Sequence, residues 1–168
     1  MYVPKSRAPL ATLFLFLIPL LLQGCLGSIQ YRPSTAIQSG LHADIFNFSD
    51  RDLNPDRVDD LYLEVARLMG VTPNSSKPRP QVLVVSPVEI HKRYLSLRPT
   101  AKTQGGIAVA LYIPHEDTIL IPHFDRALLS HELTHYFTFQ YLSAPRSKWE
   151  QIAEEITDKI KNKERIIR

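Results

Sequence analysis

Apolar residues recur at helical spacing in the segment that follows residue 54. They form one stripe, most members three or four positions apart: Val58, Leu61, Val65, Leu68 and Met69. This spacing predicts an amphipathic helix. Asn54 and Pro55 suit its cap and first turn, and Gly70 suits its end.

Short apolar runs follow this helix. Residues 81–86 read as a buried strand, and residues 87–97 as a short helix that begins with proline. Two further runs cover residues 107–114 and 118–122, and the polar residues 115–117 between them suit a turn. The two runs therefore predict a hairpin.

Helical spacing returns in the last third of the chain. Asp125 suits the cap of a helix that reaches about residue 142, and residues 147–150, Ser-Lys-Trp-Glu, read as a capping box for a last helix. This order of elements predicts an α+β domain over residues 51–168, with a small mixed sheet and a hairpin covered by helices. Residues 25–50 show no periodicity and predict a tether.

The N-terminus has the pattern of an export signal. Lys5 and Arg7 precede a largely apolar run over residues 10–22. That run is shorter than the roughly 20 residues that span a bilayer, and a basic start before it is typical of a signal peptide, here residues 1–24. Without those two basic residues the net charge falls from +3 to about +1. We therefore expect no nucleic-acid partner.

Cys25 is the only cysteine, so it cannot form an intrachain disulfide. Residues 22–25, Leu-Gln-Gly-Cys, resemble the processing box of bacterial lipoproteins. The resemblance implies that Cys25 carries acyl chains such as palmitate, which anchor the mature protein to a membrane of the bacterial cell envelope, facing the periplasm or the exterior. The alternative is ordinary signal cleavage that leaves a free thiol.

Residues 131–135 read His-Glu-Leu-Thr-His, in a segment of helical pattern. Residues four apart lie on one helix face, so His131 and His135 can direct two imidazoles at one Zn²⁺. Glu132 lies beside the metal rather than on it, where it can act as general base on a zinc-bound water. The motif predicts one zinc ion per chain and hydrolysis. The alternative is a helix with two surface histidines.

A catalytic zinc needs a third protein ligand. The predicted last helix offers three acids: Glu150, Glu154 and Glu155. With 18 residues between His135 and Glu154, the chain resembles the gluzincin metallopeptidases of the aminopeptidase-like branch. The resemblance implies Glu154 as the metal ligand and Asp158 as the partner that orients a ligand histidine. Thermolysin-like spacing would select Glu155, which has Lys159 in the orienting position.

Gluzincins hold their substrate against a strand near the metal. The resemblance implies this role for residues 105–110, with Gly106, Ile107 and Ala108 contacting the peptide backbone. The alternative is plain sheet core. Because 14 residues follow Glu154 in the sequence, we expect a minimal gluzincin of one subdomain, and no residue is identified for stabilising an oxyanion.

Together these features predict a membrane-anchored zinc metallopeptidase that hydrolyses peptide or protein substrates. The second hypothesis is a zinc-binding envelope lipoprotein that binds a partner and cleaves nothing. A third is a structural lipoprotein without metal. The substrate and the choice between endo- and exopeptidase action stay open.

Overall fold

The computed structural model describes residues 38–49, 53–98 and 107–167. Its strands form one sheet in the order β1-β2-β3-β5-β4. They are β1 (Gln38–Ser39), β2 (Asp44–Asn47), β3 (Gln81–Val84), β4 (Leu111–Ile113) and β5 (Thr118–Ile121). The three inner strands run parallel to one another, whereas β1 and β4 pair antiparallel at the two edges.

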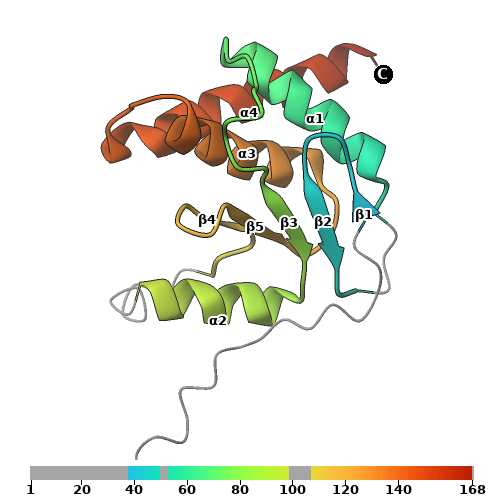
Figure 1. Cartoon of the computed structure of the whole chain (residues 1–168), viewed down its shortest axis with the longest axis vertical. Coiled ribbons are helices and arrows are strands. Elements are labelled where there is room, and N and C mark those ends of the chain that lie inside the picture. The colour runs from blue at the N-terminus through green and yellow to red at the C-terminus, as the bar shows by residue number, and fades with distance from the viewer. Residues whose placement is uncertain (1–37, 50–52, 99–106, 168) are drawn as a thin grey trace, which may run out of the picture. The chain divides into compact units, whose positions relative to one another are not determined.

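Four α-helices cover this sheet. They are α1 (Pro55–Leu68), α2 (Pro87–Leu97), α3 (Arg126–Gln140) and α4 (Trp149–Ile167). Figure 1 shows α1, α3 and α4 on one face of the sheet and α2 on the other. The predicted α+β class, with a mixed sheet and helices, is confirmed.

The sheet register places the core. Ile45, Val82 and Ile119 are neighbours across the three parallel strands and are almost completely buried. They belong to one cluster with residues of α1, α3 and α4. Because side chains alternate along a strand, Leu83 and Leu120 face the other way, toward the layer that contains α2.

Helix ends lie where the cap residues predict them. The Asn54 side chain accepts a hydrogen bond from the amide of Asp56 at 2.8 Å, and that of Asp125 accepts from Leu128 at 2.9 Å. Gly70 follows α1 with φ 67, a left-handed conformation that favours glycine.

The tether prediction for residues 25–50 is wrong where the structure describes that range, residues 38–49. Residues 38–39 and 44–47 form β1 and β2, and β2 pairs with β3 inside the sheet. Strands of two and four residues are too short for a period-2 pattern to show. Burial shows that this segment belongs to the domain, because only 1% of the surface of Ile45 is exposed.

Two predicted boundaries also differ. Of the strand expected over residues 107–114, only residues 111–113 pair in the sheet, as β4. The expected capping box is replaced by a 3-10 turn, η3 (Arg146–Lys148), that leads into α4. A helix-capping residue needs extended backbone, and Ser147 lies inside this turn.

The predicted signal peptide, residues 1–24, and the predicted lipid attachment at Cys25 lie outside the described residues. Within the described ranges, no helix combines the length and the apolar content needed to cross a bilayer.

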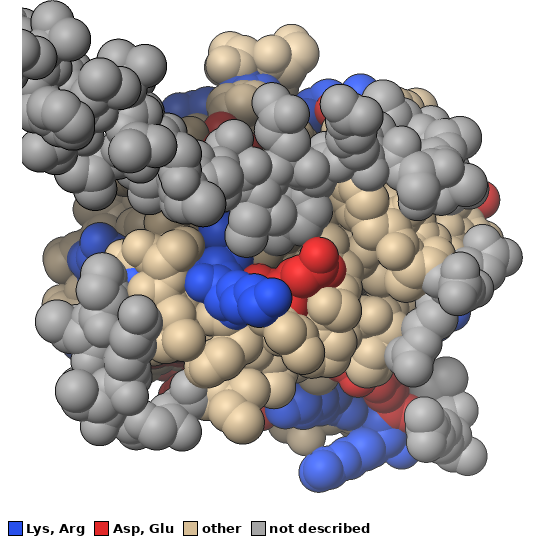
Figure 2. Space-filling view, turned by 90° about the horizontal axis from the view of Figure 1, so that it is seen from below, with Lys and Arg blue, Asp and Glu red and all other residues tan. Residues whose placement is uncertain are grey.

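Charged side chains are mixed on the face seen in Figure 2. Basic and acidic residues lie side by side near its centre, and most of the described surface around them is uncharged. The described part of this face therefore carries no broad patch of one sign.

Candidate metal centre

Helix α3 brings the two motif histidines together. His131 and His135 are one turn apart, and their Nε2 atoms lie 3.1 Å from each other. His135 is buried, with 8% of its surface exposed, whereas His131 is partly exposed. Two ring nitrogens at this distance can share a proton in a hydrogen bond or share a metal ion.

The first turn of α4 supplies a carboxylate to this pair. One oxygen of Glu150 lies 3.3 Å from Nε2 of His131, and the other lies 3.6 Å from Nε2 of His135. In a tetrahedral site with ligands about 2.1 Å from the metal, neighbouring ligand atoms are roughly 3.4 Å apart. Within the described residues, these three side chains are the group with the spacing of metal ligands.

The chemistry of the three donors also suits a metal. Burial, together with the neighbouring His131, lowers the pKa of His135 to about 4, so its imidazole is neutral at neutral pH, as a metal ligand must be. Two imidazole nitrogens and one carboxylate oxygen are the ligand set of several catalytic zinc sites. The residues present therefore fit Zn²⁺.

The acid beside the histidines is Glu150, not the expected Glu154. Glu154 and Glu155 are exposed, and neither belongs to the ligand group. Glu155 instead accepts a hydrogen bond from the side chain of Gln151 at 3.0 Å. Fourteen residues separate His135 from Glu150, so the 18-residue spacing of the aminopeptidase-like branch is not the one that the structure brings together.

The expected orienting residue is not in place either. Asp158 is exposed on α4. Nδ1 of His135, the atom that such a carboxylate would contact, is buried and has no hydrogen-bond partner among the described residues.

A tryptophan explains why Glu150 is the acid that faces α3. The ring of Trp149 lies 6.2 Å from that of His135 and 5.8 Å from that of Phe139. Its Nε1 donates to the carbonyl of Ala144 at 3.1 Å. These contacts hold the first turn of α4 against α3, so the next residue reaches the histidines.

The side chain of Glu132 lines the same cleft as the two histidines, but it is more buried than that of His131. It is buried, with 7% of its surface exposed. Burial raises the pKa of its carboxyl to about 8, a backbone hydrogen bond from Tyr112 opposes the shift, and the charge of Glu150 adds to it. Tyr112 belongs to β4, so the edge of the sheet meets the motif here.

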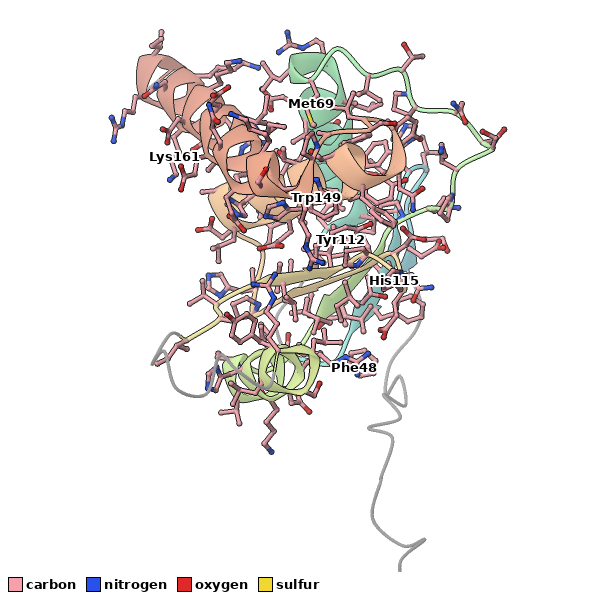
Figure 3. All side chains as sticks on the ribbon, turned by 90° about the vertical axis from the view of Figure 1, so that its left-hand side faces the viewer. Phe48, Met69, Tyr112, His115, Trp149 and Lys161 are labelled. Carbon is pink, nitrogen blue, oxygen red and sulfur yellow. The ribbon has the colours of Figure 1, made fainter. Side chains whose placement is uncertain are left out.

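An open cleft of about 650 Å³ borders these groups. His131, Glu132, His135 and Glu150 line it, together with the chain from Ile107 to Tyr112. In Figure 3, Trp149 lies at the start of α4, above the strand that carries Tyr112. The cleft thus lies between α3, α4 and the edge strand.

Five predicted site residues line this cleft: Ile107, Ala108, His131, Glu132 and His135. Glu154 and Asp158 are not among its lining residues, and Gly106 lies outside the described residues. Glu150 is one of the three acids that the predicted last helix offers, but the resemblance selects Glu154 by its 18-residue spacing. Comparison with protein-family models, with curated proteins and with solved structures finds no match to this chain.

Proposed function

We propose that this chain is a zinc-dependent metallopeptidase in which His131, His135 and Glu150 hold the metal. One observation carries the proposal: at the wall of an open cleft, the Nε2 atoms of His131 and His135 lie 3.1 Å apart, and one carboxylate oxygen of Glu150 lies 3.3 Å from the first and the other 3.6 Å from the second. Bound Zn²⁺ would supply a Lewis acid that polarises a carbonyl and acidifies water.

Glu132 is the general base of this proposal. It follows the ligand His131 directly and lines the same cleft. Its carboxylate takes the proton of the attacking water and then hands it to the leaving amine. For this step the carboxyl must be ionised, so the charge of bound Zn²⁺ would have to offset the burial that raises its pKa to about 8.

The edge strand supports a peptide as substrate. β4 pairs with β5 on one side, and it is the last strand of the described sheet on the other. An extended peptide can add to such an edge through its backbone, a common mode of peptide recognition. The chain from Ile107 to Ala110, which leads into β4, lines the cleft and would lie along this peptide.

The arrangement proposed is gluzincin-like, because an acidic ligand on a later helix completes a His-Glu-x-x-His site. Glu150 takes the ligand position that the resemblance assigned to Glu154. The lipid anchor on Cys25 and the location in a bacterial cell envelope are also part of the proposal, and they rest on residues 1–25 of the sequence alone.

The test uses the full chain purified in a mild detergent and loaded with zinc. We expect it to cleave members of a broad peptide library, and Glu132→Gln to bind the same amount of zinc but lose about 10²–10⁴-fold in rate. His131→Ala should lose both zinc binding and peptide cleavage. Equal cleavage by the wild type and Glu132→Gln, or no cleavage by either protein, would refute the proposed peptidase activity.

The unpartnered Nδ1 of His135 favours a second candidate. A ligand histidine is normally oriented through this atom, and loss of that contact typically weakens metal affinity or activity about 10–100-fold. A zinc-binding envelope lipoprotein that binds a partner without cleavage would tolerate this. It predicts about one zinc per chain and no turnover of any library peptide.

A further inference from the structure

Basic side chains dominate the charge of the cleft wall. Arg98, Arg146 and Lys161 line it, and among the described lining residues the only acids are Glu132 and Glu150, both already assigned to the metal chemistry. None of the three basic residues has an ion-pair partner among the described residues. Four other basic residues of the described part form ion pairs, Arg79, Arg93, Arg126 and Lys163, whereas others, such as Lys159, do not.

Two of these cations are held against aromatic rings of the cleft. The guanidinium of Arg98 lies 5.4 Å from the ring of Tyr94, and that of Arg146 lies 6.0 Å from the ring of Trp149. Such contacts orient a guanidinium without neutralising it. Both side chains remain available to an anion in the cleft.

A buried hydroxyl lies on the same wall. Thr157 has 6% of its surface exposed, and its Oγ1 has no hydrogen-bond partner among the described residues although it lines the cleft. A buried polar atom left unpaired costs about 1–3 kcal/mol. Because Oγ1 itself is buried, this side chain must rotate toward the cleft before a ligand can accept its hydrogen bond and remove that cost.

Thr157 and Lys161 form a pair. They are four residues apart on α4 and therefore lie on one face, and both line the cleft. In Figure 3, Lys161 lies farther along α4 than Trp149, so this pair is separated from the metal ligands along the helix. A hydroxyl and an ammonium side by side suit a carboxylate.

The distance along α4 between Glu150 and this pair also indicates which part of a bound peptide would carry the carboxylate. By helix rise, Thr157 is about 10 Å and Lys161 about 16 Å from Glu150 along the axis. An extended peptide advances about 3.3 Å per residue. The pair is therefore within reach of a group about three to five residues from the bond next to the metal.

We propose that the substrate is an anionic peptide, and that Thr157 and Lys161 bind one of its carboxylates while Arg98 and Arg146 attract others. The inference rests on the proposed peptidase function, whose substrate class it names. The carboxylate can belong to an acidic side chain or to the C-terminus of the peptide.

The test measures binding rather than turnover. Full-length Glu132→Gln protein, zinc-loaded and in detergent, is titrated with eight-residue peptides that differ only by Glu or Gln at one position, each with a free or an amidated C-terminus. Trp149 is the only tryptophan of the chain and lines the cleft, so its fluorescence reports occupancy. Labelled peptides give a second readout by anisotropy.

We expect the Glu peptide to bind at least about fivefold more tightly than the Gln peptide, or the free acid more tightly than the amide. Lys161→Gln should reduce this preference to less than about twofold, and Thr157→Val should weaken it. Lys159→Gln is the matched control, because Lys159 is an exposed residue of α4 that does not line the cleft. Circular dichroism checks that each variant folds.

Equal affinity for all four peptides, no binding of any of them, or a preference that survives Lys161→Gln would overturn the inference. Failure of the proposed function gives a different result. In that case the preference for the anionic peptide is present in the binding assay, while the wild-type protein cleaves none of the same peptides.

Discussion

A carboxylate oxygen of Glu150, on the first turn of α4, lies 3.3 Å from Nε2 of His131 on α3. This contact joins two helices across the connection that includes η3. It also changes which acid is the candidate third ligand, because Glu150 rather than Glu154 is within reach of both histidines.

Replacing Glu150 should therefore affect metal binding more than replacing Glu154. We expect Glu150→Ala to reduce zinc affinity by at least about 100-fold, since loss of a direct ligand exceeds the roughly 10–100-fold effect of losing an orienting partner. The measurement is competition for zinc against a chromophoric chelator.

Glu154→Ala is the matched control for that experiment, because it removes the same side chain from an exposed position one turn farther along α4. We expect its zinc affinity to be within a factor of two of the wild type. The reverse order of effects would restore Glu154 as the ligand.

Metal removal should lower the stability of the fold. A ligand that binds only the folded state stabilises it by about 2.7 kcal/mol at a concentration 100 times its dissociation constant. We expect chelation to lower the thermal midpoint of the wild type by several degrees. The midpoint of His131→Ala should not respond to the chelator, and an equal response from both proteins would point to an effect elsewhere.

The hairpin turn between β1 and β2 should be sensitive to one methyl group. Asp59 of α1 accepts hydrogen bonds from the amides of Leu41 and His42 at 2.5 and 2.8 Å. A Cβ on Gly40 would lie 2.6 Å from the Asp59 carboxylate, closer than such atoms approach. We expect Gly40→Ala to reduce the free energy of unfolding by about 1–3 kcal/mol.

Chemical denaturation measures this loss. Asp60→Ala provides the control, because Asp60 is the exposed neighbour of Asp59 on the same helix. Its unfolding free energy should change by less than about 0.5 kcal/mol. A Gly40→Ala protein as stable as this control would show that the turn rearranges freely.

Acid should weaken the attachment of α4 to α1. Burial by itself raises the pKa of Glu64, but hydrogen bonds and ion pairs with Lys163 and Arg126 outweigh it, so the pKa is below its ordinary value of 4.5. A carboxylate with a lowered pKa contributes stability that is present above its unfolded-state pKa and is lost as pH falls through the folded-state value.

We therefore expect the wild type to lose stability below about pH 4.5 more steeply than Glu64→Gln. Because Lys163 is half-exposed, the difference should be only about 1 kcal/mol. Urea denaturation at a series of pH values checks it. Parallel curves for the two proteins would mean that this carboxylate titrates alike in both states.

Much of the local structure could be predicted from the sequence, because it depends on contacts a few residues apart. The stripe from Val58 to Met69 and its cap Asn54 define α1 without reference to the rest of the chain. The same holds for the pairing of His131 with His135, since one helical turn brings them together. Glu132 is adjacent for the same reason.

Contacts between distant segments could not be predicted in this way. The burial of Ile45 depends on a parallel partner, Val82, that lies 37 residues farther along the chain. β2 has four residues, too few for an alternating pattern to identify it from the sequence. Its place in the sheet depends on pairing with β3.

The sequence by itself thus determined the helices, the α+β class and the placement of Glu132 beside two neighbouring histidines. Only the tertiary structure decided which acid joins them. Along α4, Glu150 and Glu154 are equivalent by helical spacing, one turn apart. The position of Trp149 against His135 and Phe139 selects between them, because the packing of one helix on another sets which turn of the second faces the first.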